Sequence, residues 1–135
     1  MFGPRPVFIG GDHYFAVKGK SVRFLHPKDR ENWEKIIIED EVWCGACIII
    51  PKGVIVGMGA VIGAGSVLTK NIPPYTVAVG NPCKPIKKIF DDKDLYEHII
   101  KIGYDEKFAK DIVNRRNNEL ELLKLVNIPV INKTE

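Results

Sequence analysis

Apolar residues recur at every sixth position between Ile38 and Pro73, and this spacing dominates the sequence. Each hexad begins with an aliphatic residue or a cysteine, at Ile38, Cys44, Ile50, Val56, Ile62 and Leu68. A second series, four positions further on, is small or aliphatic and consists of Val42, Ile48, Val54, Ala60, Ser66 and Ile72. Members of the two series stand two residues apart across each hexad boundary, so their side chains face one side of an extended chain. Each hexad therefore predicts a short strand with an inward-facing row.

Glycines fill many of the remaining positions, among them Gly57, Gly59, Gly63 and Gly65. They suit corners where the backbone bends tightly or takes a positive φ. Because strands this short cannot bury their inward rows alone, the pattern predicts a solenoid whose coils stack in parallel. An amphipathic helix is the alternative. It is disfavoured because residues six apart drift around a helix and each interior glycine would cost roughly 1 kcal/mol.

The stretch from Ile36 to Phe90 resembles the hexapeptide-repeat acyltransferases, and within them the sugar and xenobiotic O-acetyltransferases. It reads IIIEDEVWCGACIIIPKGVIVGMGAVIGAGSVLTKNIPPYTVAVGNPCKPIKKIF, with the hexads, the TK pair, the double proline and the GNP turn in order. Residues 1–13 match more loosely. The resemblance implies a mainly β fold, a left-handed parallel β-helix of three hexads per turn. The periodicity of the sequence alone does not determine the handedness of the winding.

The N-terminal segment is expected to lie inside the solenoid, because Val7 and Ile9 alternate and Gly3 stands six residues before Ile9. Members of the family usually carry further coils before this point, so the chain resembles a form that is short at the N-terminus. Residues 11–35 break the hexad register and predict a loop that leaves the solenoid and returns. We therefore expect a β-helix acyltransferase domain over residues 1–90 with this loop inserted, and a C-terminal α-helical extension over residues 91–135.

The extension shows helical spacing. Asp91 or Asp92 can cap a helix that Gly103 ends, and Asp105 can cap a second one. Their apolar positions are Leu95, Ile99 and Ile102 in the first helix and Phe108, Ile112, Val113, Leu120 and Leu123 in the second. We expect both helices to pack on an open end of the solenoid or on a neighbouring subunit, with His98 on a helix surface.

Charge and composition exclude several classes of partner. The net charge of +3 is too small to argue for a nucleic-acid partner. No apolar run reaches the length of a membrane span, and the N-terminus lacks the features of a signal peptide, so a cytoplasmic protein is expected. Cys44 and Cys47 have the CGAC spacing of redox and zinc motifs, but no second ligand pair accompanies them. We interpret both as buried or partly exposed structural thiols, and Cys83 makes the number of cysteines odd.

The chemistry that the resemblance implies requires a general base. A sugar hydroxyl is a poor nucleophile at neutral pH, and a neutral imidazole can take its proton during attack on a thioester. In the family the catalytic histidine follows the strand before the loop, and IGGDH places His13 there. His13 is the predicted base, and His26, in LHPKD, is the alternative. Without the resemblance, each would be interpreted as an exposed loop residue.

Acetyl-CoA is the co-substrate that the resemblance implies. The positions that match the family's donor site are Trp43, Ala46, Ala64, Thr69, Lys70, Lys84 and Lys87. Trp43 faces outward and needs cover from the pantetheine arm, the acceptor or a neighbouring subunit. Lys84 and Lys87 stand where the family has basic residues facing the nucleotide phosphates, although with Lys88 they could also form a solvated surface.

The predicted function is transfer of acetyl from acetyl-CoA to a hydroxyl of a saccharide or similar small acceptor, by direct attack and without a metal. The resemblance also implies a homotrimer with active sites between subunits. Alternatives are an amino-sugar N-acetyltransferase and a catalytically silent short form. A metal enzyme of the carbonic-anhydrase type would need three converging histidines, and no hexad contains one.

Overall fold

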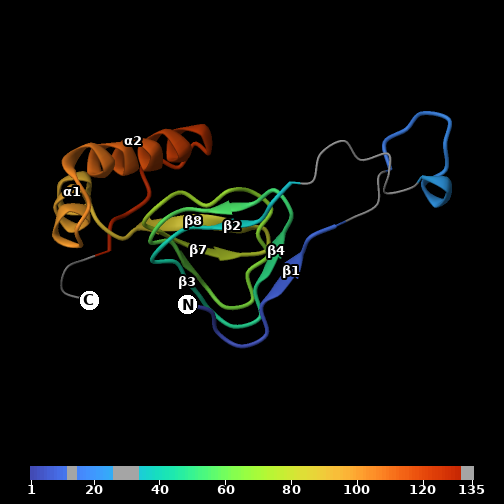
Figure 1. The fold of residues 1–135 in the computed structure, drawn as a ribbon, viewed down its shortest axis with the longest axis horizontal. Helices are drawn as coiled ribbons and strands as arrows, with labels where there is room; N and C mark the ends of the chain where they lie inside the picture. The colour runs from blue at the N-terminus through green and yellow to red at the C-terminus, as the bar shows by residue number, and fades with distance from the viewer. Residues whose placement is uncertain (12–14, 26–33, 132–135) are drawn as a thin grey trace.

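The computed structural model describes residues 1–11, 15–25 and 34–131. Within these ranges the chain forms β1 (Val7–Ile9), the 3-10 helix η1 (Val22–Phe24), β2 (Ile37–Ile38), β3 (Trp43–Cys44), β4 (Ile49–Pro51), β5 (Ile55–Val56), β6 (Val61–Ile62), β7 (Thr76–Gly80), β8 (Cys83–Lys88), α1 (Asp92–Lys101) and α2 (Glu106–Leu122). The strands form one body, and the two α-helices lie together on one side of it (Figure 1).

The strands of the hexads pair in parallel at a constant spacing, whereas β8 returns antiparallel to β7. Ile37 lies beside Ile55 and Trp43 lies beside Val61, which in both cases is a step of 18 residues or three hexads. Successive hexads lie in three different sheets, with strand orders β1-β4, β2-β5 and β3-β6-β7-β8. The chain thus passes through all three sheets before it returns to the first. We call each such turn a coil.

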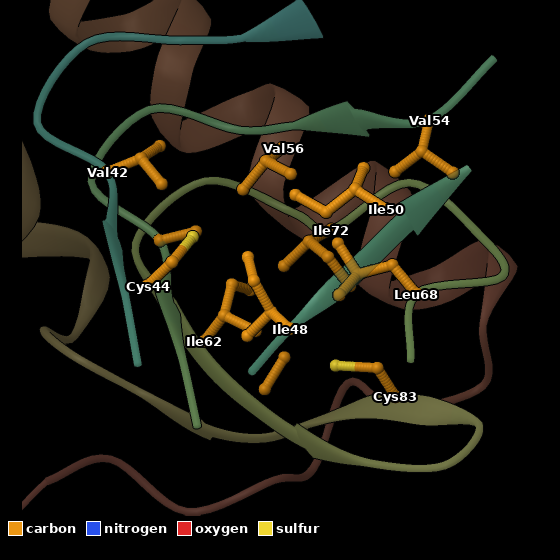
Figure 2. Close-up of a cluster of buried hydrophobic side chains, with 12 residues drawn as sticks. Val42, Cys44, Ile48, Ile50, Val54, Val56, Ile62, Leu68, Ile72 and Cys83 are labelled. Carbon is orange, nitrogen blue, oxygen red and sulfur yellow. The ribbon is translucent and has the colours of Figure 1, made fainter. Parts of the chain in front are cut away.

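The inward rows predicted from the hexads form the core. Cys44, Ile50, Val56, Ile62 and Leu68 are completely buried. The second series is buried as well, from Val42 to Ile72. Figure 2 shows side chains of both series converging on the space that the coils enclose. The polar member of the series, Ser66, is satisfied because its hydroxyl donates to the Gly63 carbonyl at 2.6 Å and accepts from the Gly80 amide at 3.1 Å.

The N-terminal segment lies in the coils as expected, but its phase differs from the prediction. Phe8 pairs with the inward residue Ile50, whereas Ile9 pairs with Pro51. Phe2 likewise lies beside Cys44. The rings of Phe2 and Phe8 meet edge to face at 5.5 Å, yet 42% and 47% of their surfaces stay exposed. Phe8 is exposed because β1 pairs on one edge only among the described strands, and Phe2 makes a single isolated bridge, to Cys44.

The loop predicted between residues 11 and 35 separates β1 from the rest of its coil. Its described part, residues 15–25, contains η1 and no strand, and it projects away from the paired strands in Figure 1. The insertion explains the register, because Val7 pairs with Ile49 across 42 residues instead of 18.

Two glycines show why the corners require this residue. A Cβ on Gly45 would lie 2.6 Å from the backbone nitrogen of Ala64 in the next coil. Gly59 has a φ of +66°, and a Cβ there would lie 2.4 Å from the ring of Tyr75. Both positions therefore exclude any side chain. At Gly45 the reason is the close approach of the next coil, and at Gly59 it is a close contact together with the positive φ.

The helices have the caps that the sequence predicts. The Asp91 carboxylate accepts from the Asp94 amide and the Asp105 carboxylate accepts from the Phe108 amide, both at 2.8 Å. They share a second core with the coils, formed by Met58, Tyr75, Leu95, Ile99, Ala109 and Ile112. His98 lies only partly on the surface of α1. It is half-buried, with ring centroids 4.8 Å from Phe90 and 5.4 Å from Tyr75.

The end of the chain returns to the sheet. Lys88 at the end of β8 donates its amide to the Pro129 carbonyl at 2.8 Å and accepts from the Ile131 amide at 2.9 Å. The predicted domain division at residue 90 stays a prediction, and these bonds join its two sides. No helix in the described ranges is long and apolar enough to cross a membrane.

Candidate functional site

Both histidines considered as the base, His13 and His26, lie outside the described residues. The assignment of the base therefore stays a prediction. The seven residues predicted to contact the donor are all described, and they fall into three neighbouring groups.

The first group is a row across the four-stranded sheet. Trp43 on β3 pairs with Val61 on β6, Val61 pairs with Val77 on β7, and Val77 pairs with Lys87 on β8. The Trp43 side chain faces outward and is 46% exposed, as predicted. Three strand spacings separate Trp43 from Lys87, or roughly 14 Å. The row could therefore contact an extended ligand at both of its ends.

A bulge brings the two predicted lysines to the same side of β8. The register runs from Val79 opposite Lys84 and Ala78 opposite Pro85 to Val77 opposite Lys87, which leaves Ile86 as the extra residue. In a regular strand, side chains three residues apart point to opposite faces of the sheet. The extra residue of the bulge brings the side chains of Lys84 and Lys87 to the same face. Both lysines thus share the outward face with Val77 and Val79.

The second group is a stacked corner. The amide of Gly65 donates to the carbonyl of Ala46 at 2.8 Å, which aligns the corner after β6 with the corner after β3. Ala46 and Ala64 lie at equivalent positions of these corners, with Gly45 packed against the Ala64 backbone. Ala64 is exposed at its corner, whereas Ala46 is half-buried and Gly3 packs against its backbone nitrogen.

The third group lines a pocket of about 400 Å³. Thr69, Lys70 and Lys84 contribute the polar side of the pocket. Its other lining residues are Asn71, Pro82, Cys83, Pro85, Leu123 and Leu125. The two segments meet because the Cys83 amide donates to the Val67 carbonyl at 2.8 Å, which fixes the start of β8 beside the Thr69 corner. The structure thus brings together three predicted donor residues that are up to 15 positions apart.

Six lining residues of this pocket, among them Asn71, Leu123 and Leu125, were not predicted as site residues. The Asn71 carboxamide oxygen accepts from the Ile55 amide at 2.9 Å and so holds the corner that carries Lys70. Leu123 and Leu125 come from the end of α2, and the sequence offers no signal that would bring them to the coils. The sequence predicts Leu123 only as an apolar position of the second helix.

Two of the three thiols, those of Cys44 and Cys83, are buried as expected of structural residues. Burial raises the pKa of Cys44 to about 11 and also raises the pKa of Cys83. Cys47 is exposed at a corner, with a φ of +57°. Among the described residues no group of three or more histidine, cysteine, aspartate or glutamate side chains is placed to hold a metal ion.

Comparison with known proteins places this arrangement in a family, although no family model matches the chain. A galactoside O-acetyltransferase from Lactococcus lactis is 49% identical over 107 residues, which cover 78% of this chain and 49% of the relative. The chain spans about half the length of the relatives that it matches.

Solved structures agree with the sequence comparison. The crystal structure of a maltose O-acetyltransferase from Clostridium difficile 630 superposes with a TM-score of 0.56 at 42% identity, covering 67% of this chain and 46% of that one. A hexapeptide-repeat-containing acetyltransferase from Vibrio cholerae, solved with acetyl coenzyme A, superposes with a TM-score of 0.54 at 28% identity, covering 66% and 45%. By sequence and by fold, the chain belongs to the hexapeptide-repeat acetyltransferase family.

Proposed function

We propose that the protein is an acetyl-CoA-dependent O-acetyltransferase that acts on a hydroxyl of a saccharide or a similar small acceptor. The observation that carries the proposal is the pocket in which Thr69, Lys70 and Lys84 meet. Support comes also from the galactoside and maltose O-acetyltransferases that resemble the chain.

The described residues fit the donor. Coenzyme A joins an adenine nucleotide with phosphates to an extended pantetheine arm. Lys70 and Lys84 are exposed at the pocket and supply positive charge for phosphate groups. The arm would follow the outward face of the sheet past the small corners at Ala46 and Ala64, with Trp43 beside the acyl end. Lys87, on the same face as Lys84, completes the predicted donor site.

His13 is the proposed general base. Its neutral imidazole would take the proton of the acceptor hydroxyl as the oxygen attacks the thioester carbonyl. The new C–O bond forms, the C–S bond then breaks, and the proton goes to the departing thiolate of coenzyme A. Acetyl thus passes directly to the acceptor. A positioned base contributes roughly 10²- to 10⁴-fold to the rate, and positioning of the donor supplies a further share.

The complete architecture is part of the proposal. The 18-residue coils and the superposed relatives support a left-handed winding of the β-helix. A homotrimer with active sites between subunits would cover Trp43 and the partly exposed aliphatic residues of the same outward phase, Ile49, Ile55, Val61 and Val67. The cytoplasmic location stays a prediction.

The test follows thiol release from acetyl-CoA across a panel of galactosides, maltose, oligosaccharides and hydroxylated drugs. The unmodified chain is compared with His13→Ala and His26→Ala. We expect acceptor-dependent release that falls at least 10²-fold in His13→Ala and persists in His26→Ala. Loss confined to His26→Ala would transfer the role of base to that residue. Coenzyme A binding without turnover on any acceptor would contradict the proposed activity and indicate a catalytically silent form.

A further inference from the structure

The apolar wall of the pocket comes from the C-terminal part of the chain. Leu123 and Leu125 line it opposite the corner that carries Thr69 and Lys70. Pro82 and Pro85 add apolar surface from the β7–β8 turn and from β8. One side of the pocket is therefore polar and cationic, and the other is aliphatic.

A defined turn at the end of α2 holds these two leucines. The Lys124 amide donates to the Glu121 carbonyl at 2.9 Å, and the Leu125 amide donates to the Leu120 carbonyl at 2.8 Å. This pair of bonds is a Schellman motif, in which the residue after the cap takes the left-handed conformation. Lys124 occupies that position with a φ of +58°. Leu123 and Leu125 therefore have fixed backbone positions on either side of the turn.

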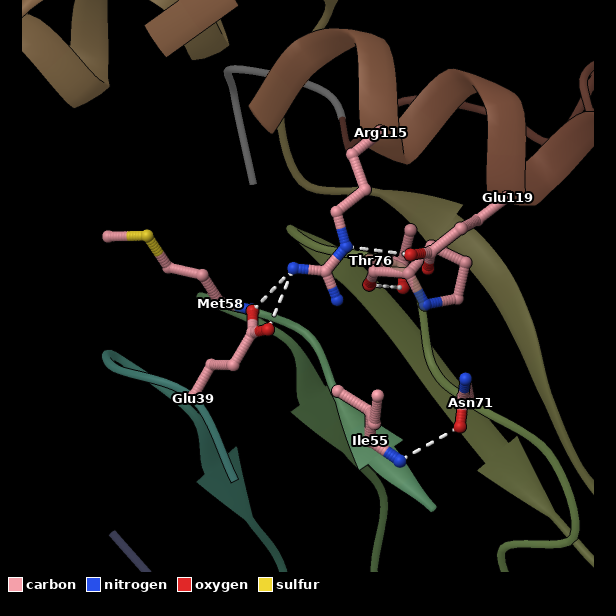
Figure 3. A network of polar contacts seen from close by, with 8 residues as sticks. Glu39, Ile55, Met58, Asn71, Thr76, Arg115 and Glu119 are labelled. Atoms are coloured by element: carbon pink, nitrogen blue, oxygen red, sulfur yellow. Dashed lines mark hydrogen bonds and ion pairs between the residues drawn. The ribbon is translucent and has the colours of Figure 1, made fainter. Parts of the chain in front are cut away.

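The helix that carries the turn is itself anchored to the coils. Arg115 on α2 binds both oxygens of the Glu39 carboxylate, and its Nε donates to Glu119 at 2.7 Å (Figure 3). Beyond the turn, the bonds of Pro129 and Ile131 to Lys88 hold the chain against β8. The leucines thus lie between two attachments to the body that contains the pocket.

We propose that Leu123 and Leu125 bind the adenine ring of coenzyme A, so that the C-terminal segment determines affinity for the nucleotide end of the donor. This inference rests on the proposed function. A planar, weakly polar base suits the aliphatic wall, and the phosphates attached to its ribose would face Lys70 and Lys84 across the pocket. Desolvation of the wall by the base favours binding without any new polar contact.

The test measures binding of coenzyme A and of adenosine 3′,5′-bisphosphate by titration calorimetry. The second probe carries the base and two phosphates without the pantetheine arm. The variants are Leu123→Ala and Leu125→Ala, both at half-buried positions outside the two cores. Leu122→Ala is the matched control, since Leu122 is 84% exposed in the same turn and does not line the pocket. Thermal unfolding of each variant verifies that it is folded.

We expect each pocket variant to bind both probes about tenfold more weakly, and Leu122→Ala to bind as the unmodified chain does. Equal affinities in all variants would overturn this inference and leave the proposed function standing. Weaker binding of coenzyme A with unchanged binding of the bisphosphate would place the leucines away from the base and overturn it too. If the unmodified chain does not bind coenzyme A, both the inference and the proposed function fail.

Discussion

Arg115 and Glu39, 76 residues apart in the sequence, form a two-pronged contact in which one guanidinium nitrogen lies 2.7 Å and 2.9 Å from the two carboxylate oxygens. Glu39 also accepts from the Met58 amide at 2.8 Å (Figure 3). A side chain that follows β2 therefore joins a coil corner to α2. The contact fixes the helix whose end forms the apolar wall of the pocket.

The first prediction concerns the strength of this contact. Arg115 and Glu39 keep 32% and 27% of their side-chain surface exposed, so solvent weakens their attraction. We expect a double-mutant cycle of Arg115→Met and Glu39→Gln to give a coupling of about 1 kcal/mol in the free energy of unfolding. Lys110→Met, on an exposed position of the same helix, is the control. A coupling of zero would mean that packing alone holds α2 on the coils.

The second prediction tests the close approach of the coils. Gly45→Ala places a methyl group against the Ala64 backbone, which cannot move without shifting its coil. We expect a loss of roughly 1–3 kcal/mol in the free energy of unfolding, measured by denaturant titration. Gly10→Ala serves as the control because a Cβ there meets no atom within 4 Å. Similar stabilities for the two variants would be incompatible with the stacked corner.

Much of the fold could be predicted because its signals are local. The hexad spacing fixed which residues face inward, and Asp91 and Asp105 are caps that can be recognised within a few positions. The phase of the N-terminal strand could not be predicted, because the inserted loop removes the link between Phe8 and the hexads that follow. Neither could the position of His98, since its burial depends on Phe90 and Tyr75 from the coil side.

The candidate site likewise contains residues that the sequence predicts and residues that it does not. Matching motifs identified Thr69, Lys70 and Lys84, and the structure brings these three together. The shared face of Lys84 and Lys87 depends on a bulge at Ile86, which periodicity would not reveal. Leu123 and Leu125 reach the pocket only because tertiary contacts direct the end of α2 there. Such contacts leave no pattern in the local sequence.

The third prediction separates the thiols by reactivity. Cys44 and Cys83 are buried and their pKa values are raised by burial, whereas Cys47 is exposed. Since the thiolate is the reactive species, a disulfide reagent at pH 8 should modify Cys47 rapidly and the other two only on unfolding. Cys47→Ser should abolish the rapid phase. A rapid phase that involves Cys44 would contradict its place in the core.

The fourth prediction concerns alkaline pH. Burial raises the pKa of Cys44 from 9.0 to about 11, so the unfolded chain loses this proton first as the pH rises. The contribution of Cys44 to the free energy of unfolding is constant below pH 9. Between pH 9 and 11 the free energy of unfolding then falls by on the order of 2 kcal/mol. The pKa of Tyr75, raised by burial to about 12, extends the fall above pH 10. Cys44→Ala should show a shallower decline between pH 9 and 11 in denaturant titrations, and an unchanged slope would contradict the assignment.

The central claim is that acetyl moves from acetyl-CoA to a sugar oxygen on this chain. The most direct measurement incubates the protein with isotopically labelled acetyl-CoA and either a galactoside or maltose, and locates the label by mass spectrometry and NMR. We predict an O-acetylated sugar that carries the label and is absent when His13→Ala replaces the unmodified protein. Label found only on the nitrogen of an amino sugar, or on no acceptor while coenzyme A still binds, would contradict the claim.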